Sequence, residues 1–418
     1  MSSSSYKIAF MADNHLGYSA KCRTHAASGL NLRVRDGYLA MRERVTQIIE
    51  AEVDLVIDGG DLFHRSWPSV SDIAWAQQQL RRFSDAGIPV VGNTGNHDAS
   101  SERGKSPATA AVHDPDRGLT FVTEPYRAVR PVEGLTVHAI SHYGLAQSER
   151  LIPEPVEGDI NIFTTHGAAM VPGHEVFLCV DSPGEQPIGL DLLLDDRYAL
   201  KLLGHYHGMD EVMPDVWYAG SSIRRGFSDP EGGRGWLLVN IDSDGSTKVE
   251  PQYISQRPQF DLPKIDASAL TGAEVEARIR ANLTDVEVDD AIVRQVVTNC
   301  ATNTRRGIDQ PALGELVRDS LMWMPDFRRP DVIVSTADSE TADSETVVAH
   351  ASDSMITAGS ADLPTVYSGW IGGWAEANHL SDALKPVVVT EGGRHLLAAS
   401  EDAETGADFA TPAEGNAA

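Results

Sequence analysis

Short apolar runs recur along the first half of the chain, and each run ends in polar residues. The first three are YKIAFMAD, ending at Asp13, VDLVIDGGD, ending at Asp61, and IPVVGNTGNHD, ending at Asp98. Between them, residues 36–52 and 71–86 carry apolar side chains at the spacing of an amphipathic helix. Alternation of strand and helix predicts an α/β fold with right-handed crossovers and a parallel sheet at its core.

Further strands follow at wider intervals. INIFTTHG ends at Gly167, and YALKLLGHYH ends at a pair of histidines. After them, WYAGSSI and GWLLVNI have the pattern of later strands of the same domain. We therefore predict an N-terminal domain over residues 1–250.

The composition changes after residue 250, and residues 251–334 predict a small α+β domain. The proline-containing QRPQFDLPKID leads into a helix, GAEVEARIRANL, then a strand, AIVRQVVTN, and a second helix, QPALGELVRDSLMW. The repeated unit TADSE then predicts a flexible acidic linker at residues 335–350. Residues 351–418 are predicted to be a flexible tail that holds one apolar island at about 363–398.

The chain is strongly acidic. It has 61 Asp and Glu against 34 Lys and Arg, a net charge of -27, and only seven lysines. An acidic, lysine-poor surface suits a protein that works in concentrated salt, so we interpret the source as halophilic; an ordinary acidic protein is the alternative. Such a charge normally argues against a polyanionic substrate. At about 1 M salt, however, the Debye length is about 3 Å, so DNA is not excluded.

Cysteine content and hydropathy indicate a reduced cellular compartment. The three cysteines are far apart in the sequence, which suits a protein without a disulfide framework. No apolar run approaches the roughly 18 residues of a membrane span, and MSSSSYKIAF lacks the pattern of a signal peptide. We expect a cytoplasmic protein.

Residues able to bind metal lie at the ends of five predicted strands. They are Asp13, His15, Asp61, His64, Asn96, His97, Asp98, His166, His205 and His207. Because loops at the carboxyl ends of parallel strands converge, we expect them to form one site. Carboxylate, amide oxygen and imidazole suit an ion such as Mn²⁺. Their number fits two ions about 3.5–4 Å apart that share a carboxylate, which clamps a phosphate and activates a water.

Each motif alone has a plainer explanation. A single histidine is more often packed in a core than bound to metal, and Gly-Asp after a strand is more often just a turn. The ordered combination of five such motifs, each after an apolar strand, is what favours a metal site.

The ordered set Asp-x-His, Gly-Asp, Gly-Asn-His-Asp, His and Gly-His-x-His resembles the calcineurin-like metallophosphoesterase superfamily over roughly residues 6–245. The resemblance implies a β-sandwich of two facing sheets flanked by helices. Carried over by position, one metal takes Asp13, His15 and His207, the other takes Asn96, His166 and His205, and Asp61 bridges the two. His97 would bind the phosphate and protonate the leaving oxygen, and Asp98 would hydrogen-bond His97.

The segments ADNHLG, GDLFH and GNHD are similar to the DNA-repair nuclease branch of that superfamily, the Mre-eleven/SbcD type. YAGSSIRRGFSD is similar to the stretch that follows Gly-His-x-His in this branch, although Ala219 replaces the usual proline. His64 matches a histidine that supports exonuclease action; a buried histidine at a helix start is the alternative. The resemblance implies an exonuclease and endonuclease with two Mn²⁺ ions, acting on double- and single-stranded DNA ends in double-strand-break repair. It also implies a homodimer and a partner, an SMC-like coiled-coil ABC ATPase.

Residues 251–334 occupy the place of the DNA-binding cap of this branch. The arginines that we predict as phosphate contacts there are Arg278, Arg280, Arg294, Arg305, Arg306, Arg318, Arg328 and Arg329. For each one, a solvated or salt-bridged position is the alternative. The island at 363–398 occupies the place where the branch binds its ATPase, and it could equally pack on its own domain.

Two other functions stay open from the sequence. The same chemistry could serve a small-molecule or protein phosphoester instead of DNA, or the chain could mainly tether DNA ends with marginal cleavage.

Overall fold

The computed structural model describes most of the first 330 residues and little beyond them. The described ranges are 5–102, 104–147, 151–171, 186–242, 245–330, 332–334 and 347–349. They divide between two compact units, which we describe separately. The first comprises Met1–Pro263, Arg280–Gln295 and Gln310–Pro325, and the second comprises Lys264–Ile279, Val296–Asp309 and Asp326–Ala418. The predicted tail lies outside the described residues, as does the predicted linker apart from residues 347–349.

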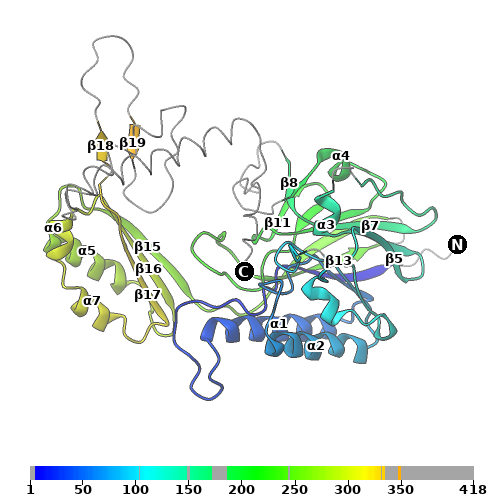
Figure 1. The fold of residues 1–418 in the computed structure, drawn as a ribbon, viewed down its shortest axis with the longest axis horizontal. Coiled ribbons are helices and arrows are strands. Elements are labelled where there is room, and N and C mark those ends of the chain that lie inside the picture. Colours follow the sequence, from blue (N-terminus) through cyan, green and yellow to red (C-terminus); the bar gives the residue numbers. More distant parts are fainter. Residues whose placement is uncertain are drawn as a thin grey trace, which may run out of the picture. The chain divides into compact units, whose positions relative to one another are not determined.

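Two six-stranded sheets form the core of the first unit (Figure 1). The first sheet has the order β14-β13-β1-β2-β3-β4. Its strands are β1 (Tyr6–Met11), β2 (Leu55–Asp58), β3 (Val90–Gly92), β4 (Leu119–Phe121), β13 (Gly235–Ile241) and β14 (Thr247–Tyr253). The four strands from β1 to β4 are parallel, and the β13–β14 hairpin joins them antiparallel to β1.

The second sheet has the order β11-β12-β10-β7-β6-β5. Its strands are β5 (Tyr126–Val132), β6 (Leu135–Ile140), β7 (Ile160–His166), β10 (Leu200–Gly204), β11 (Asp210–Met213) and β12 (Val216–Tyr218). The central four strands are parallel, and the edge strands β5 and β11 are antiparallel to their neighbours.

Side-chain alternation along β1 shows how the layers are held together. Ile8 and Phe10 pack between the two sheets, in a core that includes Ile162 and Leu202 of the second sheet. Ala9 and Met11 pack on the opposite face, in a core shared with the helices α1 (Leu32–Glu50) and α2 (Val70–Asp85). A strand buried on both faces needs apolar residues at every position. The prediction of a β-sandwich flanked by helices is confirmed.

The first helix begins four residues before the predicted start. Asn31 is its N-cap, and the Asn31 side chain accepts a hydrogen bond from the backbone N–H of Arg33. Ser69 and Asp72 form a reciprocal capping box at the start of α2. Apolar spacing alone does not register a polar cap, which explains the difference at α1.

Shorter elements connect the strands. They are η1 (Ala108–Val112), η2 (Pro115–Arg117), α3 (His142–Leu145), β8 (Ala168–Ala169), β9 (Pro187–Ile188) and α4 (Leu190–Leu193). The described helices include none that is long and apolar enough to cross a membrane.

Residues beyond 258 form a further sheet of order β15-β16-β17, with helices between its strands. The elements are β15 (Gln259–Asp266), α5 (Gly272–Thr284), β16 (Ile292–Thr298), α6 (Thr302–Arg306), α7 (Gln310–Leu316) and β17 (Met322–Phe327), followed by the pair β18 (Val332–Val334) and β19 (Val347–Ala349). The helix predicted over 310–323 ends at Leu316. The Leu321 N–H bonds the Ala291 carbonyl instead, and the next residues extend into β17.

Arg44, on α1, is a fully buried arginine that connects the helix to two loops of the sandwich. Its guanidinium donates to the Ala12 carbonyl (2.8 Å), the Asn14 side-chain oxygen (3.1 Å) and the Gly220 carbonyl (3.2 Å). Burial lowers the pKa of Arg44 to about 9, against the opposing effect of the nearby carboxylates. The loop that follows β1 is therefore positioned by a side chain from the outer helix layer.

We expect Arg44→Met to lower the free energy of unfolding by about 2 kcal/mol or more, because three buried acceptors lose their donor. Urea denaturation monitored by circular dichroism measures the change. Arg42→Met, at an exposed position of the same helix, is the matched control and should change stability by about 0.5 kcal/mol or less. Equal effects of the two substitutions would contradict this account of Arg44.

Candidate metal centre

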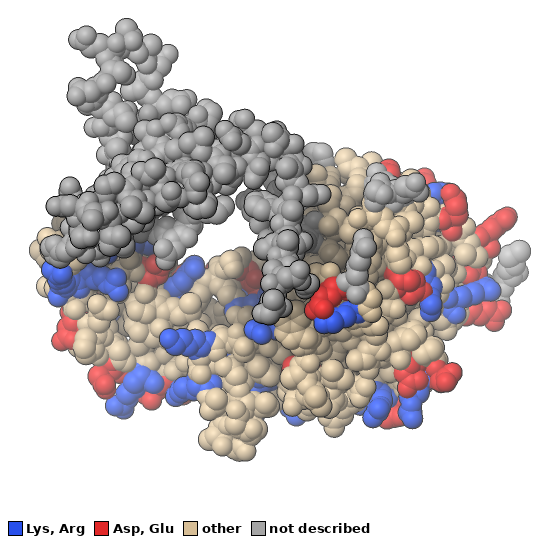
Figure 2. All heavy atoms as spheres, viewed as in Figure 1, with Lys and Arg blue, Asp and Glu red and all other residues tan. Residues whose placement is uncertain are grey.

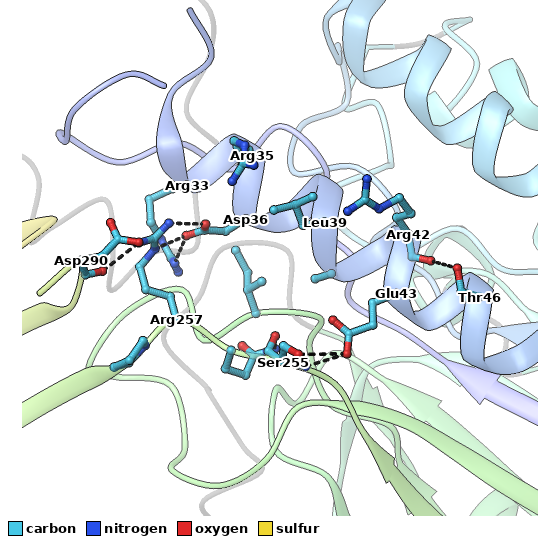
Figure 3. A pocket seen from close by; sticks show the side chains of 14 residues that line it. Arg33, Arg35, Asp36, Leu39, Arg42, Glu43, Thr46, Ser255, Arg257 and Asp290 are labelled. Carbon is cyan, nitrogen blue, oxygen red and sulfur yellow. Dashed lines mark hydrogen bonds and ion pairs between the residues drawn. The ribbon is translucent and has the colours of Figure 1, made fainter. Parts of the chain in front are cut away.

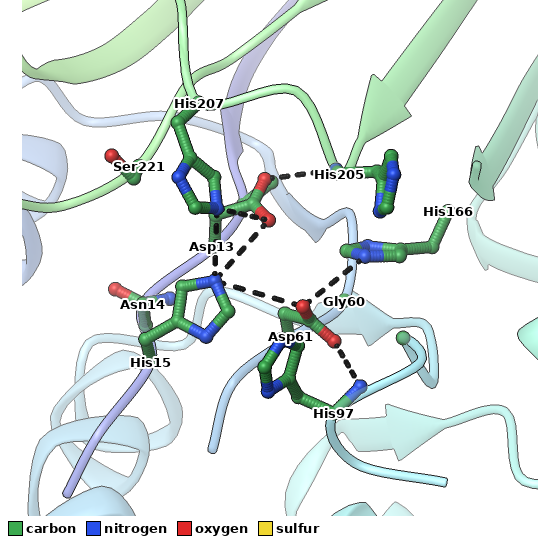
Figure 4. Close-up of polar contacts among 12 residues, drawn as sticks. Asp13, Asn14, His15, Gly60, Asp61, His97, His166, His205, His207 and Ser221 are labelled. Atoms are coloured by element: carbon green, nitrogen blue, oxygen red, sulfur yellow. Dashed lines mark hydrogen bonds and ion pairs between the residues drawn. The ribbon is translucent and has the colours of Figure 1, made fainter. Parts of the chain in front are cut away.

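The predicted ligands meet across the sandwich (Figure 4). Strands β1, β2 and β3 of the first sheet lead to Asp13, His15, Asp61, Asn96 and His97, and strands β7 and β10 of the second sheet lead to His166, His205 and His207. The carboxyl ends of parallel strands in the two facing sheets converge, so the five clusters lie around one point.

Four of the predicted ligands have a left-handed backbone, which is unusual for residues other than glycine. Their φ angles are 51° at Asp13, 44° at His15, 54° at Asp61 and 105° at His205. Such conformations cost on the order of 1–3 kcal/mol each and occur at functional sites. Hydrogen bonds hold them: Asp13 N–H to the Gly60 carbonyl and His15 N–H to the Asp61 carbonyl, both 2.9 Å. Backbone strain thus coincides with the residues that the motifs single out.

One ligand group consists of Asp13, His15 and His207. The two imidazole Nε2 atoms are 3.1 Å apart, and they lie 3.7 Å and 3.8 Å from the Asp13 Oδ1 atom. This Oδ1 atom is buried and has no hydrogen-bond partner in the described part of the chain. An unpaired buried carboxylate oxygen facing two ring nitrogens is costly without a cation, so the group fits a divalent metal.

A second group lies on the other side of Asp61. The Asp61 Oδ2 atom is 3.3 Å from His166 Nε2 and 3.6 Å from His15 Nε2, so this carboxylate faces both groups. The Asn96 side-chain oxygen is 3.1 Å from His166 Nε2 and 3.3 Å from His205 Nδ1. His166 Nδ1 lies 2.9 Å from the Gly59 carbonyl, where it donates, so Nε2 is the ring nitrogen that faces the site. Asp61 is predicted to bridge two metal ions. Its position between the two ligand groups suits that prediction.

His97 and His64 lie side by side next to this cluster. Their rings stack with centroids 5.1 Å apart, and His97 Nδ1 is 2.9 Å from the His64 carbonyl oxygen. The backbone N–H of His97 donates to Asp61 Oδ1 at 2.8 Å. Donation from Nδ1 to a carbonyl leaves His97 Nε2 to exchange protons.

The predicted hydrogen bond between Asp98 and His97 is wrong. The Asp98 carboxylate accepts from the backbone N–H groups of Leu62 (3.2 Å), Phe63 (2.8 Å) and Gly95 (3.2 Å). Asp98 therefore joins the loops after β2 and β3, and the backbone of His64 orients His97 instead. Sequence adjacency placed Asp98 beside His97, but the turn points the two side chains in different directions.

Residues 6–209 match the family of calcineurin-like phosphoesterases. This part of the chain is a calcineurin-like phosphoesterase domain. A protein of Haloferax volcanii named DNA double-strand break repair protein Mre11 is 27% identical over 292 residues, which are 69% of this chain and 60% of that protein. A Halobacterium salinarum protein of the same name is 27% identical over 348 residues, 80% of this chain and 83% of that protein.

Solved structures show weaker similarity. The crystal structure of TT1561 of Thermus thermophilus covers 59% of this chain and 99% of that chain, at 14% identity and a TM-score of 0.33. At this level of similarity, the fold assignment rests on the family match and on the two sheets described above.

Electrostatics make the centre of the phosphoesterase domain attractive to cations. Burial raises the pKa of Asp61, but the charge and hydrogen bond of His166 outweigh burial and hold the pKa well below its usual range. Burial opposes protonation of His166, yet the Asp61 carboxylate raises the pKa of His166 to about 10. Burial, followed by the charge of Arg225, lowers the pKa of His15 well below its usual value. Two buried carboxylates thus hold a positive charge at His166, and a metal can replace that proton.

Burial also sets the protonation of the neighbouring groups. It lowers the pKa of His64 to about 4, with the charges of His97 and Arg225 adding to the effect, so His64 is neutral at pH 7. Burial, and then the nearby Asp61 charge, raise the pKa of Asp98 well above its usual value.

Two residues close to His207 escaped the sequence analysis. Asp229 Oδ1 is 2.9 Å from His207 Nδ1, and Arg225 Nη2 is 3.2 Å from the same nitrogen. Burial opposes ionisation of Asp229, but its hydrogen bond with His207 lowers the pKa of Asp229 to about 2. Both residues lie in YAGSSIRRGFSD, whose similarity was noticed, but no spacing rule brings position 229 back to position 207.

We expect Asp229→Asn to weaken metal binding by about 10- to 100-fold, because a carboxylate behind a metal-bound histidine fixes its tautomer and basicity. Isothermal titration with Mn²⁺ measures the affinity. Asp215→Asn, in a turn of the second sheet, is the matched control and should bind as the wild type does. An unchanged affinity for Mn²⁺ in Asp229→Asn would contradict the role of Asp229 in fixing the tautomer and basicity of His207.

Metal binding should release protons. The pKa of His166 near 10 means that this ring is protonated at pH 7 without metal, and coordination requires the neutral ring. Apparent affinity should therefore rise with pH between about 7 and 9, with about one proton released per chain at pH 7. Titrations in two buffers of different ionisation enthalpy count the protons, and equal enthalpies in both would exclude this linkage.

Proposed function

We propose that the chain is a metal-dependent nuclease that hydrolyses phosphodiester bonds of DNA in double-strand-break repair. The main support is the position of the Asp61 carboxylate, which lies between two groups of candidate nitrogen and oxygen ligands and next to His97. This arrangement supports phosphoester hydrolysis. The relatives named DNA double-strand break repair protein Mre11 support DNA as the substrate.

The residues fit two ions. One ion would be held by Asp13, His15 and His207, the other by Asn96, His166 and His205, and Asp61 would be shared. The donor set of carboxylates, amide oxygen and imidazoles without thiolate supports Mn²⁺. When bound, such a pair of ions stabilises charge on the phosphate and makes water a better nucleophile.

The chain's own residues supply the remaining steps. His97 holds a proton at Nε2 and delivers it to the leaving oxygen, while the His64 carbonyl keeps Nδ1 occupied. The neutral His64 ring stacks on His97 and limits its rotation. Asp98 draws the loops after β2 and β3 together, so His97 stays next to Asp61.

DNA binding by this acidic chain would rely on local contacts. Lys and Arg side chains are scattered among Asp and Glu on the face that Figure 2 shows. Among the predicted cap arginines, Arg294, Arg318 and Arg328 lie within salt-bridge distance of carboxylates. For these three, the alternative of a salt-bridged position is therefore favoured over a phosphate contact. Arg278, Arg306 and Arg329 are exposed and have no ion pair within the described residues. We propose these last three as phosphate contacts.

The partner proposals rest on the family resemblance. The proposed contact with an SMC-like coiled-coil ABC ATPase at 363–398 lies outside the described residues. For the proposed homodimer, Trp67, which precedes α2, and Val70, its first residue, are 74% and 83% exposed. Two exposed apolar side chains three residues apart support an interface there.

The test is Mn²⁺-dependent cleavage of end-labelled linear double-stranded DNA in molar KCl by wild type and His97→Ala. We expect cleavage by wild type and a loss of about 10²–10⁴-fold in the variant, the usual effect of removing a general acid. His25→Ala is the matched control, because the His25 ring contacts Ser28 within a surface loop.

A chromogenic phosphodiester separates the alternatives in the same experiment. Hydrolysis of this compound by a wild type that leaves DNA intact would favour a small-molecule or protein phosphoesterase. Firm DNA binding with marginal cleavage of both substrates would favour an end-tethering function.

A further inference from the structure

The backbone of Arg225 is fixed beside the metal centre. Its N–H donates to Asp229 Oδ2 at 2.7 Å, and its carbonyl accepts from the Tyr18 hydroxyl at 2.7 Å. Tyr18 belongs to the loop after β1 that also carries the first ligands. The Arg225 guanidinium thus projects from a segment held on both sides, with Nη2 located 3.2 Å from His207 Nδ1.

The hydrogen bonding of His207 determines what this guanidinium can do. Asp229 Oδ1 lies 2.9 Å from Nδ1 of His207, and a carboxylate at that distance requires a proton on the nitrogen. With the proton on Nδ1, the Nε2 lone pair faces Asp13 and His15, as a metal ligand requires. A protonated Nδ1 cannot accept from Arg225. The donors of Arg225 are therefore not used by His207.

The Asp229 carboxylate lies close to Arg225 but bonds its backbone. Asp229 accepts from the Arg225 backbone, and within the described residues no ion pair involves the Arg225 guanidinium. The adjacent Arg224 differs: its guanidinium lies 5.4 Å from the Phe227 ring and 3.8 Å from Glu231.

We propose that Arg225 binds the phosphate next to the scissile one on a DNA strand and so favours polynucleotides over single phosphodiesters. This inference rests on the proposed nuclease function. The His207 ring lies between the Arg225 guanidinium, near Nδ1, and the ligand group at Nε2, so Arg225 would contact a group beside the reacting phosphate and not that phosphate itself. On a nucleic-acid strand, that group is the neighbouring phosphodiester, and a guanidinium offers paired donors to its oxygens.

The experiment measures steady-state kinetics of the Mn²⁺-loaded full chain on a DNA duplex and on bis(p-nitrophenyl) phosphate, which has a single phosphate. For Arg225→Gln we expect KM for DNA to rise by about tenfold or more, the loss of one charged hydrogen bond, with kcat little changed. Hydrolysis of the single phosphodiester should stay at the wild-type rate. Arg225→Lys should recover part of the DNA affinity, and Arg224→Gln is the matched control in the same loop.

A modified duplex locates the contact. A neutral methylphosphonate is placed on each side of the cleaved bond in turn. On the side that Arg225 contacts, it should raise KM for the wild type but add nothing to Arg225→Gln, because both changes remove the same interaction. Additive effects would overturn the inference. An equal loss on the single phosphodiester would also overturn it, since Arg225 would then act at the reacting phosphate or through His207.

Failure of the proposed function has a different signature. A wild type that hydrolyses the single phosphodiester but does not cleave DNA would remove the nuclease proposal, and the Arg225 inference with it. Wild-type DNA cleavage with an unchanged KM in Arg225→Gln would remove the inference alone.

Discussion

Two buried carboxylates, Asp13 and Asp61, are the constraint around which this phosphoesterase domain is arranged. Both are essentially inaccessible to solvent, and histidine nitrogens from both sheets surround them. Burying unpaired negative charge is unfavourable, so the arrangement requires positive charge at its centre, from protons or from metal. Without metal, the proton on His166 supplies this positive charge, and the carboxylates raise the pKa of His166 accordingly.

The carboxylates are held by an extension of the central sheet. Strands β1 and β2 end as parallel partners at Met11 and Asp58, but their hydrogen bonds continue into the loops. Leu16 N–H bonds the Leu62 carbonyl at 2.9 Å, and His64 N–H bonds the Leu16 carbonyl at 2.9 Å. The ligand loops therefore behave as part of the sheet, which explains how left-handed backbone conformations persist there. Close packing adds to this: a Cβ atom on Gly95 would lie 2.1 Å from Asp61 Oδ1, so only glycine fits.

Much of the candidate site could be predicted, because the motifs follow apolar strands and polar ligands at strand ends are a local pattern. The errors have local causes too. The α1 start depends on the Asn31 cap, which apolar spacing does not register. The helix expected over 310–323 gives way to β17, because the Ala291 carbonyl binds Leu321 from another part of the chain. Asp98 was predicted to hydrogen-bond His97, its neighbour in the sequence, but its carboxylate accepts hydrogen bonds from backbone N–H groups of the loop after β2.

The sequence alone determined which residue types gather after which strands, because strand periodicity and motif order are properties of short segments. The candidate ligands and the layered α/β fold were predicted from that order. Only the tertiary structure decided that the clusters meet between two sheets, that His64 rather than Asp98 orients His97, and that Asp229 and Arg225 stand behind His207. Those contacts join segments far apart in the chain, and their partners are selected by packing and hydrogen-bond geometry that no local spacing encodes.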